Sequence, residues 1–288
     1  MVERYELLTT TGPDIDFDRS QQLPPDEVSE ELAREAVKAV RFCRWANNDP
    51  DMPLRVLVPG VGPGTLPHVL LAHLQKADDA YANGPLHIDA FDIDDGAVET
   101  SRTNLAKFAG RVGLTHDIFQ ADWTDTALWE RVARQKYNLV LFNPPYLPSG
   151  EVTMVRQGYS TTPKLTLDGG PDGLNHYRAV VPRMVDVIDD KTLANTMLFR
   201  FRTPAYAQAD GIRQIFTNSF QGLRDYSLRL FPSEGPVMRR PSQTYDEQRW
   251  ISFGVLCVNP LRENGYEIDS CMARARELIN ESSATLAR

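Results

Sequence analysis

Apolar runs and helical patterns alternate along the chain from about residue 23 to residue 258. A run of four to eight mostly apolar residues between turn-forming residues is typical of a buried strand, and apolar residues three or four positions apart are typical of an amphipathic helix. By these patterns we expect strands at 55–60, 86–94, 114–122, 137–146, 195–201, 224–231 and 250–258. Helices are expected from about Pro25 to 45, and at 65–77, 95–110, 126–135, 206–220 and 269–288.

The order of these elements predicts an α/β fold. In the first half, one helix separates each strand from the next, and such connections are right-handed crossovers between parallel strands. Helices then cover both faces of the sheet, so we expect a doubly wound arrangement. We divide the chain into an N-terminal helical segment, residues 1–50, and a larger domain, residues 51–288, in which residues 231–249 form a loop or lid rich in proline and charge.

The composition indicates a soluble protein. The chain has 288 residues, of which 42% are hydrophobic, and no apolar run reaches the roughly 18 to 20 residues needed to span a membrane. The N-terminus is acidic and lacks the apolar stretch of a signal peptide, so we expect a cytoplasmic location. Cys43, Cys257 and Cys271 are too scattered for a metal site or a disulfide framework, and no metal is expected.

The charge of the chain is negative and unevenly spread. The net charge is −8; residues 1–150 carry 14 basic and 23 acidic side chains, and residues 151–288 carry 17 basic and 16 acidic side chains. An acidic chain repels phosphate backbones and lacks the electrostatic footprint of a nucleic-acid binder. Nucleic acid is therefore not an expected partner.

Glycine and acidic residues follow three successive predicted strands, where ligands of such sheets bind. Glycine lets a ligand approach the backbone, an acid after the second strand can accept from two ribose hydroxyls, and an acid with a large ring after the third can hold and wall an adenine. Taken singly, each could be an ordinary connection or helix cap. Together they predict an adenosine pocket formed by Pro59, Gly60, Gly62, Gly64, Asp92, Ile93, Asp122 and Trp123.

The sequence LFNPPYLPSG, residues 141–150, follows the fourth strand. Two consecutive prolines remove two backbone donors and end regular structure. They leave the side-chain oxygen of Asn143 and the carbonyl of Pro144 as acceptors for the protons of a nitrogen, and Tyr146 offers a ring face to a planar group or a cation. These three residues are the candidate catalytic residues of the chain.

The order of these motifs resembles the class I S-adenosylmethionine-dependent methyltransferases, specifically the HemK/PrmC-type glutamine methyltransferase family. The segment 162–181, which contains LDGGPDGL, is similar to the family segment that follows NPPY and enters a helix. The resemblance covers roughly residues 24–195. It implies a seven-stranded, mostly parallel Rossmann-like sheet with a terminal antiparallel strand, S-adenosyl-L-methionine as the cofactor, and Asn143 beside both the cofactor and the acceptor nitrogen.

Two features depart from this family. Val58 stands where members usually have an acid that anchors the methionine amino group, and only about 23 residues precede the matched segment, where release-factor enzymes carry a helical docking domain. We therefore expect the acceptor to be a small molecule or a short peptide. The candidate substrate-binding residues are Tyr146, Tyr177, Arg239 and Arg240, the two arginines as anchors for a carboxylate.

Three functions are compatible with these motifs. The first is an N-methyltransferase that acts on a nitrogen of a small molecule or short peptide. The second is a protein glutamine N-methyltransferase with a release-factor-like substrate. The third is an S-adenosylmethionine-binding enzyme that reacts the cofactor's own aminobutyrate arm in an intramolecular cyclisation, for which the loss of an acid at Val58 would be suitable.

Overall fold

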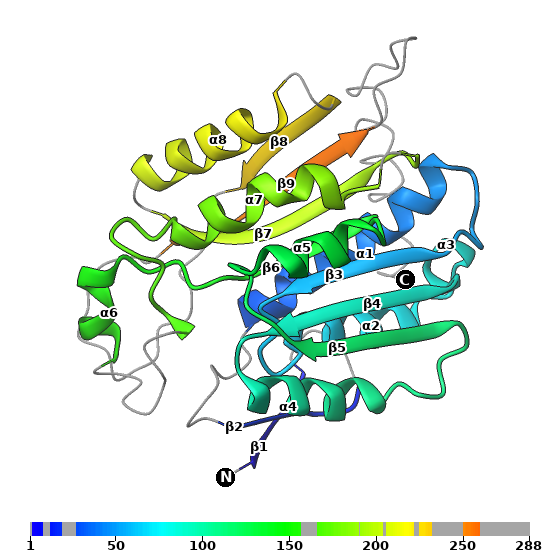
Figure 1. Ribbon diagram of the computed structural model, residues 1–288. Coiled ribbons are helices and arrows are strands. Elements are labelled where there is room, and N and C mark those ends of the chain that lie inside the picture. The colour runs from blue at the N-terminus through cyan, green and yellow to red at the C-terminus, as the bar shows by residue number, and fades with distance from the viewer. Residues whose placement is uncertain are drawn as a thin grey trace.

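A single seven-stranded sheet forms the centre of the computed structural model, which describes residues 2–7, 12–18, 27–156, 166–189, 191–203, 206–221, 225–231 and 250–259 (Figure 1). The strand order is β5-β4-β3-β6-β7-β9-β8. The strands are β3 (Leu54–Pro59), β4 (Leu86–Asp92), β5 (Leu114–Gln120), β6 (Leu139–Phe142), β7 (Asn195–Thr203), β8 (Asp225–Phe231) and β9 (Trp250–Asn259). The first five are parallel, whereas β9 is antiparallel to both of its neighbours.

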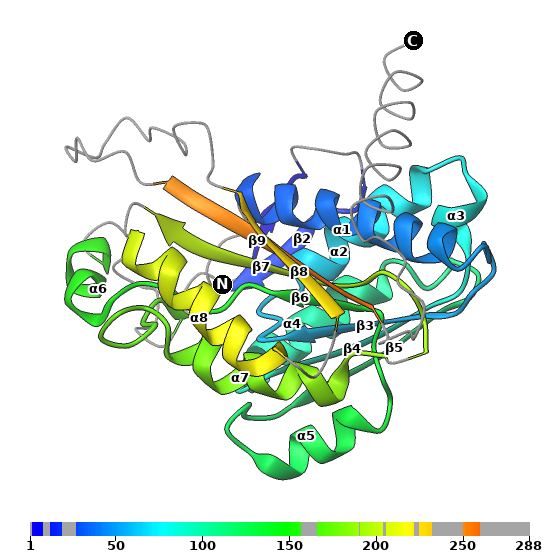
Figure 2. The ribbon, with the colours of Figure 1, turned by 90° about the horizontal axis from the view of Figure 1, so that it is seen from above.

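Helices cover both faces of this sheet, which confirms the doubly wound α/β prediction (Figure 2). One layer contains α1 (Glu27–Ala46), α2 (Thr65–Lys76) and α4 (Asp95–Ala106), and the other contains α5 (Thr126–Ala133), α7 (Asn175–Val187) and α8 (Tyr206–Phe220). Two short helices, α3 (Ala80–Asn83) and α6 (Ser149–Arg156), complete the described helices. The antiparallel strand β9 lies between β7 and β8 and is not the outermost strand of the sheet.

The strand β6 is apolar throughout because both of its faces are buried. In β6, Leu139 and Leu141 pack with α1, α2 and α4, whereas Val140 and Phe142 pack with α5, α7 and α8. A strand that buries both faces has no polar alternation, which is the pattern of inner strands in parallel sheets. The continuous apolar runs in the sequence therefore identified the inner strands.

Residues 1–50 were predicted to form a helical segment, but they also contain two strands. Before α1, strands β1 (Val2–Tyr5) and β2 (Ile15–Asp18) form an antiparallel pair, with Ile15 and Phe17 buried. The side-chain amide of Asn104 in α4 bonds both main-chain groups of Asp16, accepting at 2.9 Å and donating at 2.7 Å. The pair is thereby fixed to the same helical layer as α1.

No helix in the described part of the chain is both long enough and apolar enough to cross a membrane. The predicted loop or lid at 231–249 lies outside the described residues beyond Phe231, and the helix predicted at 269–288 lies outside them entirely.

Arg44 joins α1 to the loops at the start of β3 and β4. Its side chain is completely buried and donates to the carbonyls of Met52 (3.1 Å), Tyr81 (2.8 Å) and Pro85 (2.7 Å). Burial lowers the pKa of this guanidinium to about 10, so the group remains charged at neutral pH. One cation therefore bonds a carbonyl in α3 and carbonyls in the segments that lead into β3 and β4.

Replacing Arg44 by methionine should lower the free energy of unfolding by about 3 to 5 kcal/mol, because several buried carbonyls lose their donor. Chemical denaturation measures this change. Lys38→Met is the matched control, since Lys38 in the same helix pairs with Glu35 while its side chain is 41% exposed, and its loss should cost less than about 0.5 kcal/mol. An equal effect of the two substitutions would contradict this role for Arg44.

Candidate functional site

The predicted cofactor residues gather at the carboxyl ends of β3, β4 and β5. Gly60, Gly62 and Gly64 follow β3 and adopt left-handed φ values of 66°, 55° and 84°, which glycine tolerates best. The amides of Gly60 and Val61 donate to the carbonyl of Phe91 in β4 at 2.8 and 3.0 Å. The turn is thus bonded directly to the neighbouring strand before it enters α2.

Asp92, the last residue of β4, holds this turn in place. One carboxylate oxygen accepts from the Gly62 amide at 2.9 Å and the other from the Asp94 amide at 3.0 Å. Burial is the main cause that raises the pKa of Asp92 above the usual value, and the Asp94 charge adds to it. Each carboxylate oxygen can still accept a further hydrogen bond, as ribose binding would require.

Trp123 forms a wall beside the glycine turn. A side chain at Gly60 would place its Cβ 2.9 Å from the Trp123 ring, so the ring lies directly against this glycine. The ring also contacts His176 and Phe142, with centroid separations of 4.9 and 5.9 Å. Its carbonyl accepts from the Trp129 indole at 2.6 Å. The wall is therefore held from several sides.

Ile93 directly follows β4, and Asp122 lies two residues after the end of β5. Ile93 is 47% exposed, which is unusual for a large apolar side chain in this structure. The Asp122 carboxylate accepts from the amide of Thr124 at 2.8 Å, so it also closes the local turn. An apolar side chain and a carboxylate thus accompany Trp123 where an adenine was expected.

Asn143 follows β6 directly and contains an unusual polar atom. Its Oδ1 is buried and has no hydrogen-bond partner in the structure. Buried polar atoms are nearly always paired, because leaving one unpaired costs about 1 to 3 kcal/mol. Pro144, the next residue, is buried as well. An acceptor is therefore kept in place at the end of β6 although the fold itself does not use it.

The segment that contains LDGGPDGL fastens the loop that begins with Asn143. The amide of Leu147 donates to the carbonyl of Leu167 at 3.1 Å, and the amide of Gly169 donates to the carbonyl of Leu147 at 2.8 Å. The Ser149 hydroxyl donates to Asp168 at 2.6 Å. The loop that contains NPPY and the loop that contains LDGGPDGL are thus hydrogen-bonded to each other, and we call them the loop pair. The LDGGPDGL segment therefore has a structural role.

Tyr146 lies between this loop pair and the sheet. Its carbonyl accepts from Gln208 in α8 at 3.2 Å, and the guanidinium of Arg200 in β7 lies 5.8 Å from the centre of its ring. Arg200 is only 3% exposed and donates to Ser29 in α1 at 3.1 Å. Elements from both helical layers therefore fix the tyrosine next to Asn143.

Tyr177 does not lie at a substrate-accessible surface. It is completely buried, its hydroxyl donates to the carbonyl of Arg200, and its ring packs edge-on against Phe142 and Phe199. The prediction that Tyr177 binds substrate is corrected accordingly: the residue supports β6 from behind. Arg239 and Arg240 lie outside the described residues.

Val58 is 1% exposed and belongs to the core formed with α1, α2 and α4. The position that carries an acid in the predicted family is therefore an ordinary packing position here.

Three residues at the site were not predicted from the sequence: Asn104, Gln208 and Arg200. Asn104 donates to the carbonyl of Pro63 inside the glycine turn at 2.8 Å, besides holding β2. A polar residue within an apolar helical pattern was the available signal for Asn104 and Gln208. For Arg200 the signal was an arginine within the apolar run of β7. In each case a buried polar residue marks a contact between elements.

The fold is that of the class I methyltransferases. The structure superimposes on the catalytic domain of hMettl16, solved with a MAT2A 3′UTR hairpin, with a TM-score of 0.55 and 10% identity, covering 88% of this chain and 79% of that one. A candidate class I S-adenosylmethionine-dependent methyltransferase of Listeria monocytogenes gives a TM-score of 0.51 with 11% identity, covering 87% of this chain and 65% of the other. No protein-family model matches the chain.

The sequence is similar to glutamine methyltransferases, which confirms the resemblance predicted from the motifs. The release factor glutamine methyltransferase of Caulobacter vibrioides is 35% identical over 132 residues, which are 45% of this chain and 39% of that protein. The ribosomal protein uL3 glutamine methyltransferase of Bordetella pertussis is 24% identical over 160 residues, 56% of this chain and 44% of that protein. The chain thus spans about two fifths of the length of these curated relatives.

Gly173 tests whether the loop pair is as rigid as its contacts indicate. Its φ is 78°, and a Cβ there would lie 2.4 Å from the Tyr146 carbonyl oxygen and 2.3 Å from the Gln208 amide nitrogen. Gly173→Ala should therefore lower the free energy of unfolding by about 3 kcal/mol. The matched control is Gly150→Ala in α6, where no atom lies within 4 Å of the new Cβ. Thermal and urea unfolding measure both, and a Gly173→Ala variant as stable as the control would contradict the tight packing.

Proposed function

We propose that this protein is an S-adenosylmethionine-dependent N-methyltransferase whose acceptor is a planar nitrogen, such as a carboxamide, of a small molecule or short peptide. One observation supports the acceptor chemistry above all: the buried, unpartnered Oδ1 of Asn143 at the end of β6. A fixed acceptor with no partner in the protein is suited to receive an N–H group of a substrate.

The residues near the turn fit the cofactor. No atom lies within 4 Å of the Cβ that Gly62 lacks, so the turn is open on that side, and the Asp92 carboxylate stands beside it with acceptor capacity for a ribose. Trp123 and Ile93 provide apolar surface for an adenine. When bound, S-adenosylmethionine would supply an electrophilic methyl group attached to a sulfonium.

The protein's own contribution is to orient the nitrogen. An amide nitrogen is a poor nucleophile because its lone pair is delocalised. A hydrogen bond from its N–H to Asn143 would hold the group and favour density on nitrogen, while the Tyr146 ring would limit its rotation. Such positioning of two reactants contributes several kcal/mol to catalysis. The loop pair and Arg200 keep these two side chains from drifting.

The size of the acceptor separates two versions of this function. The curated relatives are named for protein glutamines, in a release factor and in ribosomal protein uL3. We propose a smaller acceptor because Val58 removes the family's usual acid and thereby alters one end of the site. Assays with labelled methyl groups should compare free glutamine and a short glutamine peptide with full-length release factor and uL3. Transfer only to a full-length protein would favour the protein glutamine alternative.

Val58 also favours a second candidate, the intramolecular cyclisation of the cofactor's aminobutyrate arm. With an apolar residue in place of an acid, the amino group of that arm lacks one anchor. It could then attack the γ-carbon that is bonded to the sulfonium, close a four-membered ring, lose a proton to solvent and displace methylthioadenosine. Incubation with S-adenosylmethionine alone, followed by mass analysis, distinguishes the reactions. Methylthioadenosine released without an acceptor would support cyclisation, and a stable cofactor would exclude it.

Asn143→Ala should abolish turnover and leave the fold and cofactor binding intact. Removing the unpartnered oxygen relieves a buried polar group, so stability should stay equal or rise slightly, whereas loss of positioning should slow methyl transfer by about 100-fold or more. Calorimetry with S-adenosylhomocysteine, thermal unfolding and the methyl-transfer assay measure the three quantities.

The control for this substitution is Asn83→Ala, an exposed asparagine at the end of α3. It should leave turnover unchanged. If wild-type protein binds neither S-adenosylmethionine nor its demethylated product, the proposed function is wrong as a whole. If Asn143→Ala turns over normally, only the role of Asn143 is wrong.

As the pH is lowered, the affinity for the cofactor should begin to fall at a higher pH than it would if Asp92 had the usual pKa of an aspartate. Because burial raises the pKa of Asp92, this carboxylate takes up a proton earlier as the pH decreases, and a protonated acid accepts ribose hydroxyls poorly. Asp92→Asn should bind the cofactor about 10- to 100-fold more weakly, and its affinity should depend less on pH over the acidic range in which Asp92 takes up its proton. Titration calorimetry across this range provides the measurement, and an identical slope in both proteins would refute the assignment.

A further inference from the structure

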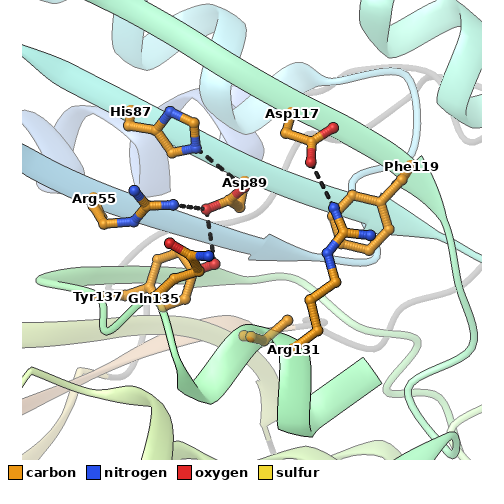
Figure 3. Close-up of a pocket in the computed structure, with 9 residues that line it drawn as sticks. Arg55, His87, Asp89, Asp117, Phe119, Arg131, Gln135 and Tyr137 are labelled. Atoms are coloured by element: carbon orange, nitrogen blue, oxygen red, sulfur yellow. Dashed lines mark hydrogen bonds and ion pairs between the residues drawn. The ribbon is translucent and has the colours of Figure 1, made fainter. Parts of the chain in front are cut away.

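A cavity lies away from the candidate site, on the sheet face that α5 covers (Figure 3). Its volume is about 310 Å³. Arg55 and His87 are the second residues of β3 and β4, so the cavity lies toward the amino ends of these strands. The glycine turn and Asn143 follow the carboxyl ends of the strands. The two places are therefore at opposite ends of the sheet.

The cavity arises from strand alternation. Leu57 and Phe91 pack in the core beneath α5, α7 and α8, and Arg55 and Asp89, two positions earlier in each strand, lie on the same face. The helix α5 ends at Ala133 and leaves this part of the face uncovered by apolar side chains. Near the end of α5, the charged residues Arg55 and Asp89 therefore occupy sheet positions that are apolar further along the same strands.

The acceptors of Asp89 are already used. One oxygen of this buried carboxylate pairs with Arg55 at 2.6 Å and accepts from the Tyr137 hydroxyl at 2.7 Å. The other lies 3.1 Å from His87 Nε2. Figure 3 shows these contacts converging on Asp89. Asp89 therefore offers little further capacity to accept hydrogen bonds from a ligand.

The other side of the cavity contains a second paired acid. Asp117 in β5 pairs with Arg131 in α5 at 2.6 Å, and the Arg131 guanidinium lies 3.9 Å from the centre of the Phe119 ring. Asp89 and Asp117 are direct partners in the β4–β5 register, so without the two arginines their charges would repel. Each acid instead has its own counter-ion.

The remaining polar capacity of the cavity is mostly that of donors. A guanidinium has five N–H groups, and the contacts to Asp89 and Asp117 each use one nitrogen of their arginine. The Nε of Arg55 is buried and has no hydrogen-bond partner, although the side chain as a whole is 30% exposed. Several N–H groups of the two arginines therefore remain for a ligand with acceptor oxygens, beside the half-exposed Asp117 and the amide of Gln135.

We propose that this cavity is a second binding site, for a small oxyanion-bearing ligand whose phosphate or carboxylate group is held by Arg55 and Arg131. Planar guanidinium groups match both of these anions with paired hydrogen bonds. The volume admits a small molecule, and the half-buried ring of Phe119 provides apolar surface for the rest of it. This site does not depend on the proposed methyl transfer, because it uses none of the same residues.

Inorganic phosphate and malonate are suitable probes, one for each source of oxyanion. Thermal unfolding is measured at pH 7 in 20 mM of each probe and in sodium chloride of equal ionic strength. For a dissociation constant on the order of 1 mM, the probe that fits should raise the melting temperature by roughly 3 °C above chloride. Calorimetry then gives the affinity directly.

Substitution locates the binding. Arg131→Met removes a side chain that is 51% exposed, so the fold should tolerate it, and the affinity for the probe should decrease at least tenfold. Arg55→Met should have the same effect if that variant folds. The matched control is Arg134→Met, which removes the same charge just beyond α5 from a residue that does not line the cavity. This variant should bind like wild type.

Each result decides the proposal. A shift with phosphate alone identifies a phosphate-bearing ligand, a shift with malonate alone a carboxylate-bearing one, and both together an oxyanion site without discrimination, provided that Arg131→Met removes the effect. The absence of any shift beyond chloride would overturn the site. So would an equal shift in wild type and Arg131→Met, because the anion would then bind elsewhere.

Discussion

The hydrogen bond between the Gly62 amide and the Asp92 carboxylate is the contact on which the candidate site depends. It joins the ends of the neighbouring strands β3 and β4 and fixes a turn whose three glycines all have positive φ. Trp123 can lie against Gly60 only because that position has no side chain. The glycine turn, the Asp92 carboxylate and the Trp123 ring therefore lie side by side around this hydrogen bond. The remaining groups of the site are placed relative to it by the parallel strands.

The main chain around Asn143 is held by many hydrogen bonds. The loop after β6 is tied to residues 167–174 by main-chain hydrogen bonds, and Tyr146 is held by groups from β7 and α8. Within this bonded loop, the Oδ1 of Asn143 is buried and has no partner. Proteins keep such atoms where they have a use that compensates their cost. The proposed role of Asn143 rests on this unpartnered oxygen.

Much of the sheet could be predicted from the sequence, because its inner strands are short apolar runs bounded by glycine, proline or aspartate. The positions of Gly60, Asp92, Trp123 and Asn143 followed from their places at strand ends. The strands β1 and β2 could not be predicted in this way, since four-residue strands have too little pattern and depend on contacts with α4. The burial of Tyr177 was missed because it arises from rings in β6 and β7 that only the folded sheet brings together.

Asn104 has a consequence beyond the turn that it supports. By bonding both the N–H and the carbonyl of Asp16, its side-chain amide occupies the outer main-chain groups of β2 as a neighbouring strand would. An uncovered strand edge is a template on which another chain can add a strand and begin to aggregate. The helix α4 thereby covers an edge of this two-stranded sheet with the amide of a single residue.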